Sequence, residues 1–417
     1  MYATLTNFIR GLSKEEYLAL AEMCRYSNNL YNAALYSVRQ YFFENEKYLK
    51  YEGNYHICKN NDNYKLLQAS VAQQTMKVVD RCFQSFFSLK EKVKKGEYQE
   101  EVKIPHYRKK GDLFNLIIPS SSITIKNGKC LIPMSLNFRK LHPGIKIWVP
   151  VPDRIKEKRI KEVHILPLCD GKYFKIQYIY IEEGSPISIN CKNIMAIDVG
   201  VDNLASCVTT LGTSFIMDGR YLKSINQGWN KRKAYLMSIA NRQGMTSTHQ
   251  LKKIALKRNN RCKDIMYKTV RYIVDYCIDN DIGTVVVGYS PKSKQNTKLG
   301  KKNNQAFCSI PFSDFRRLLK NKCNHYGIQY IEQEESYTSK SSFLDDDALP
   351  VYNSGTSNTE KFSGKRVHRG LYKSKDGTTV NADLNGAANI LRKTGLDYDK
   401  EGLKKAVLSR PQRIKLI

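Results

Sequence analysis

The sequence predicts an α/β protein that also contains a β-barrel, and three patterns along the chain predict this fold class. Long segments with apolar residues at helical spacing lie within the first 99 residues. Short alternating runs, separated by turn signals such as Asn127-Gly128, then fill residues 103–185 and favour a barrel. From residue 193 the expected order is three strands, helices, a strand, a helix and a strand, which is typical of a mixed sheet with helices packed on it.

The chain is predicted to begin with one strand and two helices. Residues 3–9 alternate as a strand does, and Ser13 with Glu16 forms the signature of a capping box before the first helix. A polar break is expected at residues 53–63, and the second helix at 64–93. The apolar stripe of the second helix favours a core contact over a binding surface.

The second half is predicted to hold the mixed sheet and a basic insertion. A β-rich apolar run from Asn193 ends in Asp198 and Gly200. Further strands are expected at 204–209, 213–217, 283–288 and 328–333, and helices at 311–326 and from about 383. Residues 221–274 hold 13 Lys or Arg and one acid in a helical pattern, which indicates a basic helical hairpin. Residues 341–379 are polar, and we expect them to be irregular.

The composition excludes several classes of protein. The 417 residues suggest two or three domains, and 41% hydrophobic residues exclude a disordered basic tail. The 69 Lys and Arg exceed the 39 Asp and Glu, which gives a net charge of +30 and indicates a polyanion as partner. An acidic membrane surface is the competing partner, but no run of about 18 apolar residues and no signal sequence is present. The eleven cysteines include no CxxC pair, so we expect reduced thiols in a cytosolic protein.

The acids of this basic chain are informative because a carboxylate beside a bound polyanion is costly unless a cation shields it. Six acids and one base lie between Glu332 and Asp347, while Asp198 ends a predicted strand and Asp383 begins a predicted helix. Carboxylates that converge at strand ends can hold two Mg²⁺ ions about 3.5–4 Å apart and promote attack on a phosphodiester. Helix capping is the alternative for Asp383. For residues 345–347 a solvated turn is the favoured interpretation.

Six motifs, in the correct order, resemble the TnpB (OrfB) family of transposon-encoded RNA-guided DNA endonucleases, which are related to compact type V CRISPR effectors. Two of the motifs resemble the first and third RuvC motifs of the family, one its YTSK turn, two its recognition helices and one the entry to its wedge barrel. In that order they are Ala196-Ile197-Asp198-Val199-Gly200, residues 381–390, Tyr337-Thr338-Ser339-Lys340, residues 28–35, residues 71–75 and residues 104–110.

The resemblance covers nearly the whole chain and implies a domain organisation. It implies a C-terminal RNase H-like (RuvC) domain with a helical insertion, and an N-terminal wedge β-barrel with an inserted helical recognition domain. The implied boundaries are 1–12 and 100–192 for the wedge barrel, 13–99 for the recognition domain, 193–340 and 380–417 for the RuvC-like domain, 221–280 for its basic helical hairpin, and 341–379 for a degenerate segment that binds target nucleic acid and lacks zinc ligands.

The chain departs from the family at the catalytic glutamate. The family normally ends the strand before its second RuvC motif with Glu, whereas this chain has Gly288 there. The next strand ends in Glu334 and Glu335. Adjacent strands lie about 4.8 Å apart, so a carboxylate on the neighbouring strand could reach the same metal, and a glycine at 288 would leave the space for it. We therefore expect a relocated glutamate, at Glu335 or Glu334.

The second departure concerns the zinc ribbon of the family. The last cysteine is Cys323, so residues 341–379 cannot supply four thiolates, and His368 alone is not a zinc site. We expect no zinc. Basic contacts from residues 362–372 are expected to keep the function of the segment. Asp345 and Asp347 are expected to tie the loop to one of three bases, namely Lys365, Arg366 or Arg369.

Candidate nucleic-acid contacts follow from the charge and from the resemblance. The 13 bases of the hairpin are hard to explain by solubility alone, although a solvated helix pair is the alternative. Gln73, Gln74 and Lys77 lie on the helix that, by resemblance, faces a short motif flanking the target, although a solvent-facing surface explains them nearly as well. The candidates for phosphate contacts are Arg108, Lys109, Lys110, Lys231, Arg232 and Lys233.

The resemblance implies a function. A guide RNA with a structured scaffold, derived from a transposon or a CRISPR array, would pair with double-stranded target DNA beside a short flanking motif. Asp198 and Asp383 would bridge two Mg²⁺ ions, Glu335 or Glu334 would complete the site, and a water molecule would attack the phosphorus. A prokaryotic cytoplasmic protein, associated with the nucleoid when bound to DNA and not with a membrane, is expected. Two alternatives stay open: a nuclease-inactive RNA-guided repressor, which Gly288 favours, and a guide-free DNA-binding transposition accessory.

Overall fold

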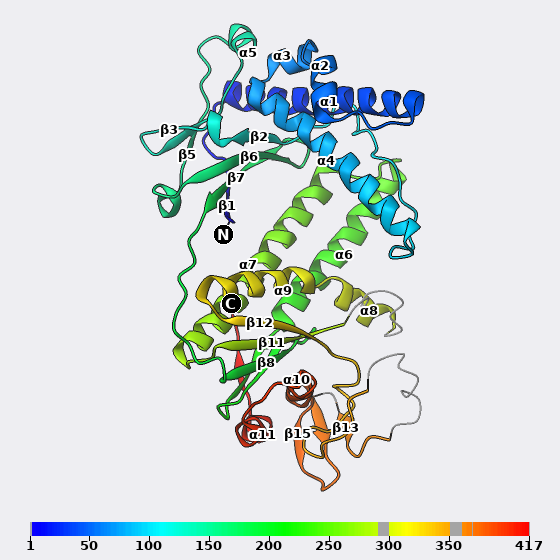
Figure 1. Cartoon of the computed structure of the whole chain (residues 1–417), viewed down its shortest axis with the longest axis vertical. Coiled ribbons are helices and arrows are strands. Elements are labelled where there is room, and N and C mark those ends of the chain that lie inside the picture. The colour runs from blue at the N-terminus through cyan, green and yellow to red at the C-terminus, as the bar shows by residue number, and fades with distance from the viewer. Residues whose placement is uncertain (1, 291–299, 351–360, 369, 417) are drawn as a thin grey trace. The chain divides into compact units, whose positions relative to one another are not determined.

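The computed structural model describes residues 2–290, 300–350, 361–368 and 370–416 (Figure 1). The chain forms two compact units, Met1–Glu182 and Glu183–Ile417, each with its own core. No helix in the described part of the chain is both long and apolar enough to cross a membrane.

The strands of the first unit form two antiparallel sheets. The first has the order β1-β7-β6-β2, and the second has the order β3-β4-β5. These strands are β1 (Tyr2–Phe8), β2 (Leu116–Pro119), β3 (Thr124–Lys126), β4 (Lys129–Leu131), β5 (Trp148–Pro150), β6 (Ile160–Leu168) and β7 (Tyr173–Ile181). Every second residue of β7 is buried, so one face of the larger sheet is apolar.

Four helices carry most of the remaining core of the first unit: α1 (Lys14–Asn45), α2 (Tyr51–Cys58), α3 (Asp62–Leu66) and α4 (Ala69–Lys94). The short helices η1 (Ser120–Ser122), α5 (Leu136–Leu141) and η2 (Asp153–Ile155) connect strands. The capping box is confirmed, because the Ser13 side chain accepts from the Glu16 amide and the Glu16 carboxylate accepts from the Ser13 amide.

Two predictions for this region are wrong. The expected polar break contains α2 and α3, because burial of Asn54, Cys58 and Tyr64 outweighs the weak helix propensity of the Gly, Asn and Asp residues there. The second long helix begins later than predicted, at Ala69, since the Gln68 side chain accepts a hydrogen bond from the Val71 amide and caps the helix there.

The second unit is built on a six-stranded sheet of order β12-β11-β8-β9-β10-β16. Its strands are β8 (Ile194–Asp198), β9 (Asn203–Thr209), β10 (Ser214–Asp218), β11 (Thr284–Tyr289), β12 (Gln329–Glu334) and β16 (Gln412–Ile414). The strands β8, β9 and β10 are antiparallel neighbours, whereas β11 is parallel to β8, β12 to β11 and β16 to β10. The carboxyl ends of β8, β11 and β12 therefore meet at one edge of the sheet.

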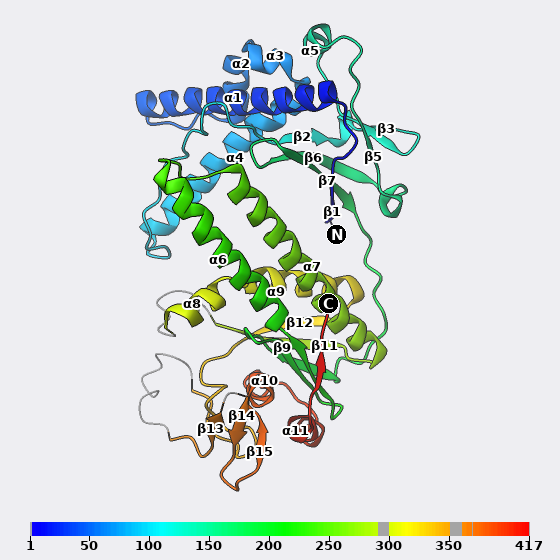
Figure 2. The same cartoon turned by 180° about the vertical axis from the view of Figure 1, so that it is seen from behind.

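Helices cover both faces of this sheet. The helices α7 and α9 lie on one face of the sheet, and α10 and α11 lie on the other (Figure 1). Met195 and Ile197 pack in the core that α7 and α9 share, whereas Ala196 packs in the core of α10 and α11. The helices α6 and α7 form the basic hairpin and lie side by side (Figure 2). The helices of this unit are α6 (Arg220–Arg242), α7 (His249–Asp279), α8 (Lys301–Cys308), α9 (Phe312–Tyr326), α10 (Ala382–Arg392) and α11 (Lys400–Leu408).

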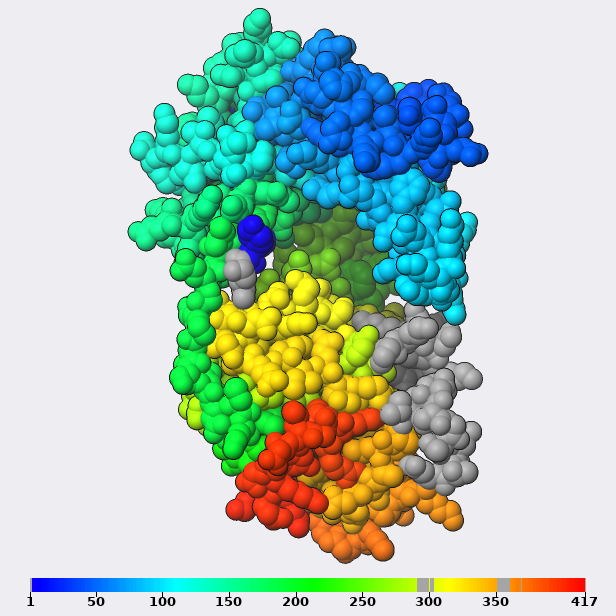
Figure 3. All heavy atoms as spheres, viewed as in Figure 1, coloured from blue at the N-terminus to red at the C-terminus, as the bar shows by residue number. Residues whose placement is uncertain are grey.

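The polar segment after β12 is more regular than predicted. Its strands β13 (Lys365–His368), β14 (Leu371–Lys373) and β15 (Thr379–Asn381) form an antiparallel sheet. The expectation of an irregular segment is wrong here, since strands of three or four residues are too short to show a periodic pattern. The small sheet (orange) packs against α10 and α11 (red), as the space-filling view shows (Figure 3).

Candidate carboxylate site

Three acids that lie far apart in the sequence meet at the edge of the six-stranded sheet. Asp198 is the last residue of β8, Glu335 follows β12 directly, and Asp383 is the second residue of α10. Burial raises the pKa of Asp198 well above its usual range, and the charges of Glu335 and Asp383 raise it further. The three carboxylates therefore lie within electrostatic range of one another. The helix α10 also approaches closely, because a Cβ placed on Gly386 would lie 3.0 Å from Asp198 Oδ2.

The geometry distinguishes the two candidate glutamates. The Oε2 atom of Glu335 is buried and has no hydrogen-bond partner among the described residues, and burial raises the pKa of Glu335. Glu334 instead forms an ion pair with Lys393 and accepts a hydrogen bond from the Ser336 amide at 2.7 Å. Burial acts to raise the pKa of Glu334, but the bonds from Lys393 and Ser336 outweigh burial, and the pKa is lowered. Of the two glutamates, Glu335 is the one whose charge raises the pKa of Asp198.

Strand register explains why Glu335 and Gly288 are neighbours. Gly288 of β11 pairs with Gln333 of β12, and alternate residues of a strand share a face, so Glu335 lies on the same face as Gly288. A Cβ placed on Gly288 would lie 2.6 Å from Glu335 Oε2 and 2.6 Å from Ile390 Cδ1. Real Cβ atoms do not approach other atoms so closely. The glycine therefore provides the space that the Glu335 carboxylate occupies.

We expect Gly288→Ala to destabilise the protein by about 1–3 kcal/mol, because the added methyl group would overpack the contact with Glu335 and Ile390. The matched control is Gly228→Ala in α6, where a Cβ would meet nothing within 4 Å. That control should gain about 0.5–1 kcal/mol from helix propensity. Thermal unfolding measures both variants, and equal shifts of the two would contradict the packing argument.

Asp383 is not the cap of its helix, so the capping alternative is wrong. The N-cap is Asn381, whose side chain accepts from the amides of Asp383 at 3.0 Å and Leu384 at 3.2 Å. The Asp383 carboxylate is therefore available for other partners. Its Oδ1 accepts from Arg366 Nη2 at 3.0 Å, and its Oδ2 accepts from Asn203 Nδ2 at 2.6 Å.

Asp198 and Asp383 line a pocket of about 350 Å³. Both acids and bases line the pocket, so it can accept a ligand that carries both a phosphate and a bound cation. The lining residues are Asp198, Gly200, Val201, Asp202, Asn203, Ser206, Arg220, Arg366, Gly370, Asn381, Asp383 and Arg413.

The three carboxylates are the candidate ligands for Mg²⁺. Within the described ranges, no group of three or more His, Cys, Asp or Glu side chains is already arranged to hold a metal ion. The chemistry of the donors nevertheless suits a hard cation, because carboxylate oxygens are the ligands that Mg²⁺ prefers. The Glu335 Oε2 atom is buried without a partner, and the charge of Asp198 is opposed by two neighbouring carboxylates. A bound cation would give the Glu335 Oε2 atom a partner and would offset the repulsion at Asp198, so the residues fit Mg²⁺.

Buried amide side chains join two of the sequence motifs. From α10, the Asn389 Nδ2 atom donates to the carbonyls of Thr338 at 2.9 Å and Ser341 at 2.7 Å, and the Asn385 Nδ2 atom donates to Ser341 at 2.8 Å. The Asn385 Oδ1 atom accepts from the Phe343 amide at 2.9 Å. These bonds fix the turn that follows Glu335 against the helix that carries Asp383, so both motifs serve one site.

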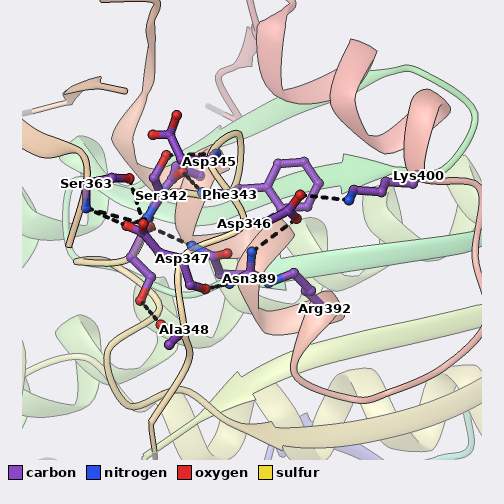
Figure 4. A network of polar contacts seen from close by, with 12 residues as sticks. Ser342, Phe343, Asp345, Asp346, Asp347, Ala348, Ser363, Asn389, Arg392 and Lys400 are labelled. Atoms are coloured by element: carbon purple, nitrogen blue, oxygen red, sulfur yellow. Dashed lines mark hydrogen bonds and ion pairs between the residues drawn. The ribbon is translucent and has the colours of Figure 1, made fainter. Parts of the chain in front are cut away.

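The acidic residues 345–347 lie at a partly exposed turn, as the interpretation as a solvated turn predicted, and two of them also bind backbone amides (Figure 4). The Asp347 carboxylate accepts from the amide of Ser342 at 2.8 Å and from Ser363 Oγ at 2.6 Å, and it thereby joins the two ends of the segment. Asp346 forms ion pairs with Arg392 and Lys400.

Two of the three partners predicted for this turn, Lys365 and Arg366, are wrong. Asp345 accepts from the Lys375 amide at 2.9 Å, and Asp347 binds Ser342 and Ser363, whereas Lys365, Arg366 or Arg369 had been expected. Arg369 lies outside the described residues. The physical reason is that backbone amides are fixed close to the turn, whereas Arg366 is held at Asp383.

Asp347→Ala is expected to loosen the segment, because the amides of Ser342 and Ser363 would lose a charged acceptor. We expect a loss of about 2 kcal/mol, together with faster amide hydrogen exchange at Ser342 and Ser363. The control is Asp346→Ala, because the Asp346 side chain is 55% exposed in both of its ion pairs, and we expect it to change stability by less than about 1 kcal/mol. Unchanged exchange in Asp347→Ala would refute the assignment.

The first-unit candidates for phosphate contacts differ in exposure. The guanidinium of Arg108 lies 4.3 Å from the Phe114 ring centroid and donates to Asn28 Oδ1 at 2.9 Å. Asn32 also holds this loop by bonds to the Arg108 backbone. Lys109 and Lys110 are exposed. Arg108 therefore positions the loop, and the two lysines present its charge.

The other candidates lie on helices. Lys231, Arg232 and Lys233 are exposed on α6, where Arg232 lies over Tyr235 and Lys233 over Trp229. These pairs combine positive charge with aromatic surface, as single-strand binding sites do.

On α4, Gln73 and Gln74 are partly buried, whereas Lys77 is exposed and lies 5.1 Å from the Tyr51 ring centroid. The structure thus leaves Lys77 more accessible than the two glutamines.

Comparison with known proteins identifies the class of protein first. Over 91% of this chain and 83% of the other, the fold is similar to that in a cryo-EM structure of the Cas12f1–sgRNA–target DNA complex, with a TM-score of 0.59 and 15% identity. The chain therefore has a TnpB/Cas12-like fold of mixed α/β content.

Sequence comparison identifies the family. The family model of the OrfB probable transposase matches residues 180–294, and the Cas12f1-like TNB domain matches residues 312–390. A TnpB-like protein, ORF457 of Acidianus two-tailed virus, is 22% identical over 93% of this chain and 86% of its own length. The two family models, this relative and the fold together support a TnpB-family protein that is related to the type V effectors.

Proposed function

We propose that the chain is an RNA-guided DNA endonuclease that hydrolyses phosphodiester bonds at Asp198, Glu335 and Asp383. The observation that carries this proposal is the meeting of these three acids at one sheet edge, with the Glu335 Oε2 atom buried and without a partner among the described residues. Membership of the TnpB family supports the reaction class. A transposon-derived or CRISPR-derived RNA would supply the guide.

The domain roles follow from this proposal. The six-stranded sheet and its helices would be the RuvC-like nuclease domain, in which α6 and α7 form the insertion. The sheets of the first unit would serve as the wedge barrel, and α1 to α4 as the recognition domain. The segment from 341 to 379 would bind target nucleic acid without zinc.

The residues of the carboxylate site and of the pocket beside it would have different chemical roles. Asp198, Glu335 and Asp383 would hold Mg²⁺, which when bound supplies a Lewis acid and lowers the pKa of a coordinated water. Arg366 donates to Asp383 and is partly exposed in the pocket, so it can also neutralise a phosphate that enters there. Asp198 is half-buried where it lines the pocket, and its partly apolar surroundings strengthen electrostatic interactions within the site.

The surface charge supports binding of nucleic acid. The net charge of +30 is sufficient for long-range attraction of RNA and DNA, and the exposed Lys231, Arg232 and Lys233 would contact phosphates. Lys109 and Lys110 would do the same in the first unit. Lys77, with Gln73 and Gln74, would face the flanking motif. Such backbone contacts position the duplex, whereas base pairing with the guide would read the sequence.

One observation favours a second candidate function, a nuclease-inactive RNA-guided repressor. Both oxygens of Asp383 already accept hydrogen bonds, from Arg366 and from Asn203, and no metal-ready cluster exists among the described residues. In that case the chain would bind the DNA that its guide RNA selects tightly, without cutting it.

The test begins with expression of the protein together with its native flanking DNA and sequencing of the RNA that co-purifies. We expect a discrete RNA with a constant scaffold and a variable end. A plasmid that matches the variable end should then be cut with Mg²⁺ but not with EDTA. Tight binding without cutting would support the repressor, and fragmented host RNA would support the guide-free accessory.

A further inference from the structure

A chain of hydrogen bonds reaches Asp383 from the C-terminal strand. Asn203 Nδ2 donates to Asp383 Oδ2 at 2.6 Å, and Arg413 Nη1 donates to Asn203 Oδ1 at 2.9 Å. Arg413 also lies 3.5 Å from Asp218, whose side chain is 7% exposed. The contact crosses the sheet from β16 to the start of β9 and then to α10.

The chemistry of the three groups fixes the orientation of the amide. A guanidinium only donates and a carboxylate only accepts, so the Asn203 oxygen must face Arg413 and its nitrogen must face Asp383. Asn203 therefore holds one oxygen of Asp383 with a neutral donor. A neutral donor orients a carboxylate without neutralising its negative charge. A cation that binds there would need that negative charge.

The strand β16 places Arg413. Arg413 pairs with Ile216 in the parallel register of β16 and β10, and the ion pair with Asp218 holds its guanidinium beside the pocket. Arg220 also binds Asp218 and lines the pocket, but among the described residues no hydrogen bond joins it to Asn203. The two arginines thus have the same partner and the same charge but differ in their access to Asn203.

We propose that Asn203 and Arg413 are positioning residues that orient the Asp383 carboxylate for Mg²⁺. This inference rests on the proposed function, in which Asp383 is a metal ligand. Groups that orient metal ligands typically contribute about 10–100-fold to metal affinity or activity. The assignment makes the C-terminal strand β16 a part of the site.

Loss of a positive charge and loss of orientation at Asp383 predict opposite changes in cation affinity, which makes the proposal testable. Removal of a nearby positive charge should by itself strengthen binding of a cation. Loss of orientation should weaken it. Arg413→Gln and Arg220→Gln remove the same charge beside the same Asp218, so the comparison between them isolates the contact with Asn203.

The first experiment measures binding of Mn²⁺ to the purified protein by electron paramagnetic resonance, with Asp198→Asn as the blank. We expect Asn203→Ala and Arg413→Gln to bind Mn²⁺ about 10-fold more weakly than the wild type, and Arg220→Gln to bind it equally or more tightly. Thermal unfolding checks the fold. If Arg413→Gln loses β16, Arg413→Lys keeps the charge and is expected to weaken binding by a smaller factor.

The second experiment titrates Mg²⁺ in the guided cleavage reaction. We expect Asn203→Ala to raise the half-saturating Mg²⁺ concentration about 10-fold, with a maximal rate within a few fold of the wild type. The proposal is overturned if Asn203→Ala binds Mn²⁺ as the wild type does, or if Arg413→Gln changes binding in the same direction as Arg220→Gln. Absence of cleavage by the wild type refutes the proposed function, and the Mn²⁺ titration then still decides the positioning. A wild type that binds no more Mn²⁺ than the blank overturns both.

Discussion

Asp198→Asn is expected to abolish DNA cleavage, by a factor on the order of 10³ or more, while it raises the thermal stability of the metal-free protein. Burial and the charges of Glu335 and Asp383 raise the pKa of Asp198, so the folded state binds the proton of this carboxyl more tightly than the unfolded state does. Stability therefore falls as the pH rises from the usual Asp pKa through the raised value. Asn carries no charge and removes this cost.

The size of the stability gain follows from linkage. Each unit of pKa shift corresponds to about 1.4 kcal/mol, so we expect Tm to rise by at least about 2 °C at pH 8 and by less at pH 5. Calorimetry in EDTA measures this gain. The control is Asp153→Asn, because the Asp153 side chain is 91% exposed and pairs only with the surface Lys156. Retained cleavage, or a lower Tm in Asp198→Asn than in this control, would contradict the prediction.

Glu335→Gln and Glu334→Gln are expected to have different effects, although the two residues are adjacent. Glu335→Gln should reduce cleavage about 10³-fold with little loss of stability, because it removes a buried carboxylate that has no hydrogen-bond partner at Oε2 among the described residues. Glu334→Gln should retain cleavage but lose about 1–2 kcal/mol, since it leaves the buried Lys393 without its charged partner.

The pair of glutamate variants is measured by cleavage of guided plasmid DNA and by thermal unfolding of the same preparations. Each variant acts as the control for the other, because both substitutions are isosteric and lie one residue apart. Loss of cleavage in Glu334→Gln alone would reassign the site to Glu334. Normal cleavage by both variants would remove the relocated glutamate from the mechanism.

Much of this site could be predicted from the sequence, because its two aspartates lie in motifs at the ends of regular elements. Asp198 and Asp383 were identified in this way. The sequence restricts the candidate glutamate to Glu334 or Glu335 but does not choose between them. The choice depends on which face of β12 packs against α10. That face is set by the register of Gly288 with Gln333, and register is a property of the paired strands rather than of either segment.

Other parts could not be predicted because they depend on contacts between distant residues. Asn203 lies 180 positions from Asp383, and Arg413 lies 210 positions from Asn203. Nothing local to Arg413 indicates a site, since β16 is only three residues long. The small sheet of β13, β14 and β15 was missed for the same reason. By contrast, the long strands and the basic hairpin show strong periodicity and were predicted well.

The contact between Gly288 and Glu335 also constrains how such a site can evolve. By its resemblance to the family, an ancestor would carry Glu at position 288. A chain with Glu at both positions would place two carboxylates on one face of neighbouring strands, about 4.8 Å apart, in a space that admits only one. The order of substitution is then restricted. The glutamate at position 288 must be replaced by a smaller residue before Glu335 is gained, or at the same time. Under the proposed function, a lineage that changed one residue at a time would pass through a form that carries neither glutamate.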